Sequence, residues 1–328
     1  KVGGMNWAND IERIYPVPAQ ILKPGKNNIS VRVEDKYYKG GFASKAEKMY
    51  LQMGQKQLPL SGDWKFKVDT VIPDFKPFPN DVPSQLYNSM IHPLIPYGIK
   101  GVIWYQGESN TPRSKEYKIT FPNMINNWRE DWQQGDFPFL FVQLANFQVA
   151  ADKPNDDAWA ELRESQTQTL SLKNTGMAVA IDIGDAHNIH PLNKQDVGKR
   201  LMLSALKVAY IKDIVHSGPI YKSMQIEGDK IIISFDHIGS GLFVKNKHGY
   251  INEFEIAGAD KKFIWAKAKL KDDKIIVWSD EVEKPVAVRF AWSINPAEFN
   301  LYNKEGLPAS PFRTDNWEGI TDGKTFDH

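Results

Sequence analysis

The stretch GVIWYQGESN (101–110) decides the fold, because a short apolar run leads directly into a polar loop. Runs of this length and character are typical of strands buried on both faces of a parallel sheet. Two similar runs follow, FPFLFVQL (137–144) and MAVAIDI (177–183). Helical patterns flank and separate these runs, over residues 85–97, 117–132, 157–172 and 197–208. This alternation predicts an α/β fold with a parallel sheet covered by helices.

The helix expected over 117–132 rests on apolar residues spaced three and four apart. They are Tyr117, Phe121, Met124, Ile125, Trp128 and Trp132. Pro122 falls inside this pattern, and proline lacks the N–H that a helix interior uses. We therefore expect Pro122 to lie near the start of the helix or at a break.

Strand and turn patterns flank the α/β region. NISVRV (28–33) alternates as a half-buried strand does, and Pro24-Gly25 before it is a turn signal. Beyond residue 216, hairpin-like turns and the run VAVRFAW (286–292) indicate β structure again. The turns are Glu227-Gly228-Asp229 and Lys271-Asp272-Asp273. We expect the end of a β-sandwich domain over 1–60, an α/β core over 61–215 and a β-rich domain over 216–328. Residues 62–83, rich in Pro and Asp, resemble a long surface connection.

Composition excludes several classes of protein. The chain has 328 residues, a formal net charge of +1 and no cysteine. Disulfides, thiolate metal sites and a cysteine nucleophile are therefore excluded, and no strong positive field favours nucleic acid. No apolar run of the length that spans a bilayer occurs, nor does a signal peptide. Because the chain begins at Lys1 without a starting methionine, we expect that an upstream part is missing.

Ligands of such sheets bind beyond the carboxyl ends of the strands. This rule selects the segments after Tyr105, Leu144 and Ile183. After Tyr105, the side chain of Gln106 or Asn110 could donate a hydrogen bond to an oxyanion. Gly107 between them allows close approach of the backbone.

Glu108 and Ser109 leave alternatives open. Glu108 is an acid/base candidate or a carboxylate that orients Arg129, Arg163 or a backbone amide. Ser109 follows Gly107-Glu108 as the serine of a nucleophile elbow would, but Thr111 stands where the second glycine belongs. Ser109 is therefore either a nucleophile or a loop hydroxyl.

The loop after Ile183 contains His187 and His190. Pro191 follows His190, and Asn193 is a candidate N-cap with Asp196 three residues on. A histidine fixed between a strand end and a capped helix suits a general base. A metal site at Asp185, His187 and His190 is the alternative, although no HExxH pattern occurs. Phosphate, dinucleotide and EF-hand motifs are also absent from the sequence, so no cofactor is expected.

Four stretches resemble the sialate O-acetylesterase family within the SGNH hydrolases. They are GVIWYQGESN (101–110), PFLFVQLANF (138–147), TGMAVAIDIGD (175–185) and NIHPLNKQDVGKRL (188–201). In addition, PAQILKPGKNNISVRV (18–33) resembles the end of the jelly-roll domain inserted into these esterases. The resemblance implies a three-layer, flavodoxin-like SGNH core flanked by jelly-roll-like β-sandwich segments.

The resemblance also implies roles for individual residues. His190, in the IHP motif, would be the base. Gln106 would be the oxyanion-hole donor, with Gly107, Glu108 and Asn110 beside it in the oxyanion hole or substrate-binding site. The family's GQSN-type serine motif does not occur, so the nucleophile is expected in a missing N-terminal segment of the same protein.

The third member of the catalytic triad is open. His187 occupies the position, three residues before His190, where SGNH enzymes often have Asp. Either Asp185 reaches the imidazole of His190, or the site is a Ser-His dyad.

The family resemblance therefore predicts a secreted or periplasmic esterase that removes O-acetyl groups from sialic acid. Its expected partners are an O-acetylated sugar and the missing segment, without nucleic acid and without a membrane span. An acetylxylan-type polysaccharide esterase and a non-catalytic carbohydrate-binding protein are the alternatives.

Overall fold

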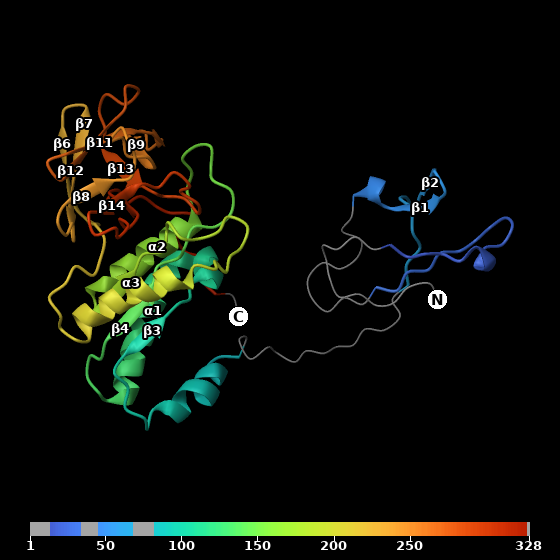
Figure 1. Cartoon of the computed structure of the whole chain (residues 1–328), viewed down its shortest axis with the longest axis horizontal. Coiled ribbons are helices and arrows are strands. Elements are labelled where there is room, and N and C mark those ends of the chain that lie inside the picture. The colour runs from blue at the N-terminus through green and yellow to red at the C-terminus, as the bar shows by residue number, and fades with distance from the viewer. Residues whose placement is uncertain (1–13, 34–44, 68–81, 327–328) are drawn as a thin grey trace. The chain divides into compact units, whose positions relative to one another are not determined.

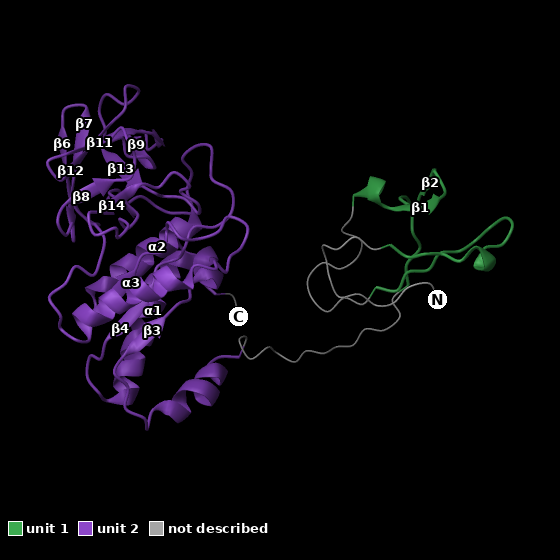
Figure 2. Ribbon diagram, in the orientation of Figure 1, with its two compact units in different colours: residues 1–76 green, residues 77–328 purple. Residues whose placement is uncertain are grey.

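The computed structural model describes residues 14–33, 45–67 and 82–326. The chain divides into two compact units, Lys1–Lys76 and Pro77–His328 (Figure 2). Within the described residues, no helix combines the length and apolar character needed to cross a bilayer.

The described part of unit 1 contains short helices and one hairpin. The hairpin pairs β1 (Tyr50–Met53) with β2 (Lys56–Pro59) in antiparallel register. Two single-turn 3₁₀ helices span Ala19–Ile21 and Ala46–Lys48. The predicted turn at Pro24-Gly25 is confirmed, with Gly25 at a φ of +88°.

The strand predicted over 28–33 is wrong. These residues form no strand, and the Ile29, Val31 and Val33 side chains are each about half exposed. A strand needs a partner for its backbone hydrogen bonds, and none of the described residues pairs with this run. Most of the 62–83 connection lies outside the described residues.

Unit 2 contains the predicted parallel sheet. It consists of β3 (Val102–Trp104), β4 (Phe139–Val142) and β5 (Thr175–Ala178), in the order β3-β4-β5. The third strand is shorter than the predicted run 177–183, because the chain turns where Ile183 N–H bonds Ala180 O at 3.2 Å. Val179, Ala180 and Ile181 lie beyond the end of β5 but stay buried, which accounts for the apolar character of this part of the run.

Three helices accompany the sheet (Figure 1). They are α1 (Ser114–Trp132), α2 (Ala158–Gln168) and α3 (Lys194–Val208). The predicted apolar face of α1 is buried at Tyr117, Phe121, Ile125 and Trp132. Pro122 lies within this helix, contrary to expectation. The carbonyl that loses its hydrogen bond belongs to exposed Lys118, where water can replace the missing N–H.

The helix predicted over 85–97 is irregular. A π-helical turn spans Tyr87–Ile91, and a 3₁₀ turn spans His92–Leu94. Pro93 lies in the second turn, where an uninterrupted α-helix would need its N–H.

The remaining strands of unit 2 form antiparallel sheets, gathered at one end of the unit in Figure 1. One sheet has the order β11-β12-β7-β6, with β6 (Ile220–Glu227), β7 (Lys230–Asp236), β11 (Lys267–Lys271) and β12 (Lys274–Trp278). A second has the order β10-β9-β13-β15, with β9 (Phe254–Ala257), β10 (Ile264–Trp265), β13 (Ala287–Phe290) and β15 (Phe312–Arg313). β8 (Leu242–Val244) pairs with β14 (Leu301–Asn303). Both predicted hairpin turns, at 227–229 and 271–273, are confirmed.

One hydrophobic cluster runs through unit 2. Phe139 and Phe141 of β4 belong to the same buried cluster as Ile231 of β7 and Phe290 of β13. Fully buried Arg163 of α2 donates to the carbonyls of Ser293 and Ile294 and so joins α2 to the segment after β13. The antiparallel sheets therefore help to position the helices and loops around the parallel sheet.

Candidate active site

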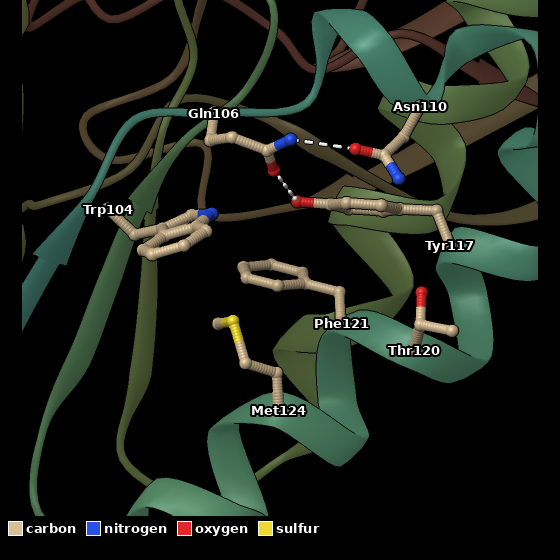
Figure 3. Close-up of a pocket in the computed structure, with 7 residues that line it drawn as sticks. All are labelled: Trp104, Gln106, Asn110, Tyr117, Thr120, Phe121 and Met124. Carbon is tan, nitrogen blue, oxygen red and sulfur yellow. Dashed lines mark hydrogen bonds between the residues drawn. The ribbon is translucent and has the colours of Figure 1, made fainter. Parts of the chain in front are cut away.

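In the loop after β3, hydrogen bonds at both the oxygen and the nitrogen of its amide orient the Gln106 side chain. Tyr117 Oη donates to Gln106 Oε1 at 3.2 Å, and Gln106 Nε2 donates to Asn110 Oδ1 at 2.7 Å (Figure 3). A primary amide has two N–H donors, so one remains available to a ligand. The arrangement thus presents an oriented, neutral hydrogen-bond donor at the end of β3.

Gly107 packs the loop against α2. Its φ is +152°, and a Cβ at this position would lie 2.8 Å from Leu162 Cδ2. The Gln106 carbonyl accepts a hydrogen bond from Gln166 Nε2 at 3.3 Å. The close backbone approach expected of this glycine is therefore present, and it fixes the main chain beside Gln106.

Glu108 does not orient either buried arginine. Arg129 donates to the Phe137 and Lys173 carbonyls, and Arg163 also donates to main-chain carbonyls. The arginine part of that alternative is wrong, because carbonyls at the ends of nearby elements already bind both guanidinium groups.

The charge of Glu108 acts instead on two tyrosines. Burial raises the pKa of Tyr105 and of Tyr117 above the ordinary 10.0, and the Glu108 charge raises both further. Tyr117 therefore stays protonated at neutral pH and can donate its hydrogen to Gln106.

Ser109 lies on an exposed part of the 3₁₀ helix Glu108–Arg113. In the described part of the chain, no hydrogen bond joins its hydroxyl to a histidine, so the structure shows no activated serine here.

A cavity of about 360 Å³ opens beside Gln106. Its walls are mostly aromatic and apolar, with the two amides at one end (Figure 3). The lining residues are Trp104, Gln106, Asn110, Tyr117, Thr120, Phe121 and Met124. A second cavity, of about 920 Å³, shares Trp104, Thr120 and Met124 and extends to the irregular helix at 85–94.

His190 is exposed in the loop between β5 and α3. Its backbone N–H donates to Asn188 Oδ1 at 2.9 Å. As predicted, Asn193 caps the helix that follows, accepting from the Asp196 N–H at 3.2 Å. The histidine therefore directly precedes a buried proline and a capped helix start, which restricts its backbone.

The Asp185 carboxylate approaches His187 rather than His190. Asp185 Oδ1 accepts from the His187 N–H at 2.8 Å and lies 3.9 Å from His187 Nδ1. Among the described residues, no hydrogen bond or ion pair joins Asp185 to the His190 ring. Nor do the described His, Asp and Glu side chains gather in a group of three that could hold a metal ion, so the geometry gives the metal alternative no support.

The start of α3 contacts the residue that precedes Gln106. Lys194 Nζ lies 4.7 Å from the centroid of the Tyr105 ring, the residue immediately before Gln106. Tyr105 and Ile183 pack against one cluster of buried residues that includes Val197 and Leu201 of α3. The structure therefore brings the Gln106 and His190 loops to the same edge of the sheet.

Sequence reasoning missed two groups that shape this edge. Asn146, after β4, accepts the Gly184 N–H at 2.7 Å with its Oδ1. Arg200 of α3 makes a two-point ion pair with Asp182, at 2.6 and 2.9 Å. The signal for Asn146 was available, since it follows a buried strand at the predicted ligand edge.

These groups suit acyl transfer. A donor held at one strand end can stabilise an oxyanion, while a histidine at a neighbouring strand end can carry a proton. Comparison with known proteins shows that the chain is similar to carbohydrate esterases. Residues 70–207 match the family model described as carbohydrate esterase, sialic acid-specific acetylesterase. Over this region the chain is similar to that family, as the resemblance in its motifs predicted.

Relatives extend the similarity. The chain is 33% identical over 256 residues to the sialate O-acetylesterases of Homo sapiens and Pongo abelii. Each match covers 70% of this chain and 48% of the relative, so the chain spans about half the length of these curated relatives. Among solved structures, a carbohydrate acetylesterase from Xanthomonas citri is 50% identical with a TM-score of 0.70. That match covers 73% of this chain and 55% of the other.

Proposed function

We propose that the protein is a carbohydrate O-acetylesterase that removes O-acetyl groups from sialic acid by a serine-based mechanism. The observation that carries the proposal is the position of the Gln106 amide. Hydrogen bonds with Tyr117 and Asn110 orient it and leave one N–H available, and it lies at the same edge of the sheet as the His190 loop. The similarity of residues 70–207 to the sialic acid-specific acetylesterase family supports the substrate class.

In the proposed reaction, the serine comes from sequence outside these 328 residues. His190 takes the serine proton as the oxygen attacks the acetyl carbonyl carbon, and Gln106 Nε2 donates to the resulting oxyanion. Collapse of this intermediate breaks the bond to the sugar oxygen, which receives the proton from His190. Water, activated by His190, then releases acetate from the acyl-serine.

Asp185 stays a prediction as the third member of the triad. Its present partner is the His187 N–H, so action on His190 requires the loop to tighten when the nucleophile is present. Asp185→Asn tests this role. A large fall in kcat indicates that the carboxylate stabilises the imidazolium, whereas a small effect indicates a Ser-His dyad.

We also propose the finer architecture of the family. This is a three-layer SGNH core over 61–215, with jelly-roll-like segments at 1–60 and a β-rich domain at 216–328. The proposed location is secreted or periplasmic. The similarity to the Xanthomonas citri structure supports the core, and the family resemblance supports the location.

The mechanism is tested with p-nitrophenyl acetate and with the protein that includes its upstream coding sequence. His190→Ala is expected to abolish turnover, while His187→Ala, three residues away and exposed, is the matched control. Gln106→Ala is expected to lower kcat by roughly 10²- to 10³-fold. Equal activity of the His190 and His187 variants would sink the mechanism.

The 328-residue chain is then assayed alone, where little hydrolysis is expected. Strong hydrolysis would put the nucleophile within this chain, and loss of that activity in Ser109→Ala would identify it. The unchanged activity of Ser109→Ala would exclude Ser109.

A polysaccharide esterase of the acetylxylan type is the second candidate. The Xanthomonas citri protein, at 50% identity, is described as a carbohydrate acetylesterase without a named sugar, whereas the sialate O-acetylesterases are 33% identical, so the similarity leaves room for a substrate other than sialic acid. Comparing kcat/KM on 9-O-acetyl sialic acid and on acetylated xylan distinguishes the two.

A further inference from the structure

The segment after β13 is fixed to the connection between β4 and α2. The carbonyls of Ser293 and Ile294 accept hydrogen bonds from Arg163, at 2.6 and 3.0 Å. The Ile294 carbonyl also accepts from the Phe147 N–H at 3.2 Å, and its N–H donates to Asp157 Oδ2 at 2.8 Å. These hydrogen bonds therefore fix the main chain of this segment beside the carboxyl ends of the parallel strands, where a ligand is expected.

Asn295, the next residue, continues this contact with its side chain. It is 6% exposed. Its Oδ1 accepts from Asn146 Nδ2 at 2.9 Å, and its Nδ2 donates to the carbonyl of Gln148 at 2.5 Å. Both atoms of one buried amide are thus used to hold the loop that follows β4.

Asn146 links Asn295 to the loop that carries His190. Its Oδ1 accepts the Gly184 N–H at 2.7 Å, and nearby the Gln148 N–H donates to the Ala186 carbonyl at 3.1 Å. A Cβ on Gly184 would lie 2.0 Å from the Asn146 carbonyl oxygen, so only glycine fits this approach. The start of the loop is therefore packed directly onto Asn146.

The histidine depends on this backbone constraint. Among the described residues, the His190 ring makes no hydrogen bond or ion pair, so no side chain sets its orientation. Its loop is instead fixed at both ends, by Asn146 at Gly184 and by the Asn193 cap at the start of α3. A proton-transferring group needs a defined position relative to the atoms that exchange the proton.

We propose that Asn146 and Asn295 are positioning residues for His190. This proposal rests on the proposed esterase function. Asn295 holds Asn146, Asn146 holds Gly184, and the loop from Gly184 to Asn193 carries the histidine. The C-terminal antiparallel part of the chain thereby takes part in catalysis without touching the substrate.

The test compares Asn146→Ala and Asn295→Ala with Asn300→Ala in the protein that includes its upstream sequence. Asn300 is a matched control because it is also a buried asparagine of the C-terminal part, directly before β14. Its two side-chain hydrogen bonds, with Tyr250 and Asn252, lie away from the strand-end loops. Both positioning variants are expected to lower kcat on the order of 10- to 100-fold with little change in KM, as a misplacement of about 1 Å does. Asn300→Ala is expected to leave kcat near the parent value.

Amide hydrogen exchange separates positioning from general destabilisation. The Gly184 N–H is expected to exchange faster in both positioning variants, at an unchanged melting temperature relative to Asn300→Ala. Asn295→Ser keeps a neutral hydroxyl that can reach Asn146 Nδ2 through a water, so it is expected to retain more of the rate than Asn295→Ala. This variant also serves if the alanine variants do not fold.

The proposal is overturned if kcat of the positioning variants falls no further than that of Asn300→Ala, or if Gly184 exchange is unaltered. His190→Ala, assayed in parallel, separates this failure from failure of the proposed function. An active His190→Ala protein refutes the function, whereas an inactive one with fully active asparagine variants refutes only the positioning.

Discussion

Glu255 makes the stability of unit 2 depend on pH. It lies on β9, directly opposite Arg289 of β13, with its side chain 1% exposed. Arg289 already pairs with Asp156 at 2.8 Å and with Asp315 at 3.0 Å, so its charge is shared among carboxylates. Burial is the largest influence on Glu255 and raises its pKa from 4.5 to about 8, against the lowering effect of Arg289.

The direction of the effect follows from proton binding. Between pH 4.5 and about 8 the unfolded chain has lost the Glu255 proton while the folded chain keeps it. The folded state then binds more protons, so the free energy of unfolding falls as pH rises across this window. At about 1.36 kcal/mol per pH unit, the full interval corresponds to about 5 kcal/mol. Glu255→Gln replaces the protonated carboxyl by a neutral amide and therefore removes this fall in the free energy of unfolding with rising pH.

The assay is urea unfolding at pH 5, 6, 7 and 8, followed by tryptophan fluorescence. Glu255→Gln is expected to match the parent at low pH and to become more stable than it, by up to about 5 kcal/mol, toward pH 8. Glu283→Gln is the control, because Glu283 is exposed. Parallel pH profiles for the parent and Glu255→Gln would refute the reasoning.

Three further substitutions test the packing around the site. Arg163→Met removes the donor to four main-chain carbonyls and should lower the free energy of unfolding by about 3–5 kcal/mol in urea titrations; a loss below about 1 kcal/mol would contradict this. Gly107→Ala forces a Cβ to within 2.8 Å of Leu162 Cδ2 and should cost about 1–3 kcal/mol in thermal melts, and an unchanged melt would argue against the strain. Tyr117→Phe releases Gln106 Oε1 and should lower kcat about tenfold at constant KM, whereas a change confined to KM would argue against amide orientation.

The fold of the α/β region was largely predictable because its signals are local. Strands buried on both faces leave continuous apolar runs, and a helix face leaves spacings of three and four. The helix start at Asn193 was predictable for the same reason, since an N-cap bonds a backbone N–H only three residues away. The prediction of a strand at 28–33 was wrong because alternating apolar and polar residues indicate only that a segment could lie on a half-buried sheet surface. They do not show whether another strand pairs with it.

The candidate site was predictable only in part. Gln106 and His190 fall in polar loops after buried strands, so position along the chain was enough to select them. The link between Asn146 and Asn295 joins residues 149 positions apart, and no local pattern pairs two asparagines over such a distance. The failure of Asp185 to contact the His190 ring depends on the path of a loop, which residue types do not specify.

The buried cluster that β4 shares with β7 and β13 determines how unit 2 unfolds. Its parallel and antiparallel sheets expose the same apolar surface when either comes apart, so neither retains a complete core alone. Loss of the antiparallel strands and loss of the histidine loop's geometry should then occur in one transition. A polypeptide cleaved between α3 and β6 would have to recover the geometry of the candidate site by reassociation of its two fragments, with the core as their interface.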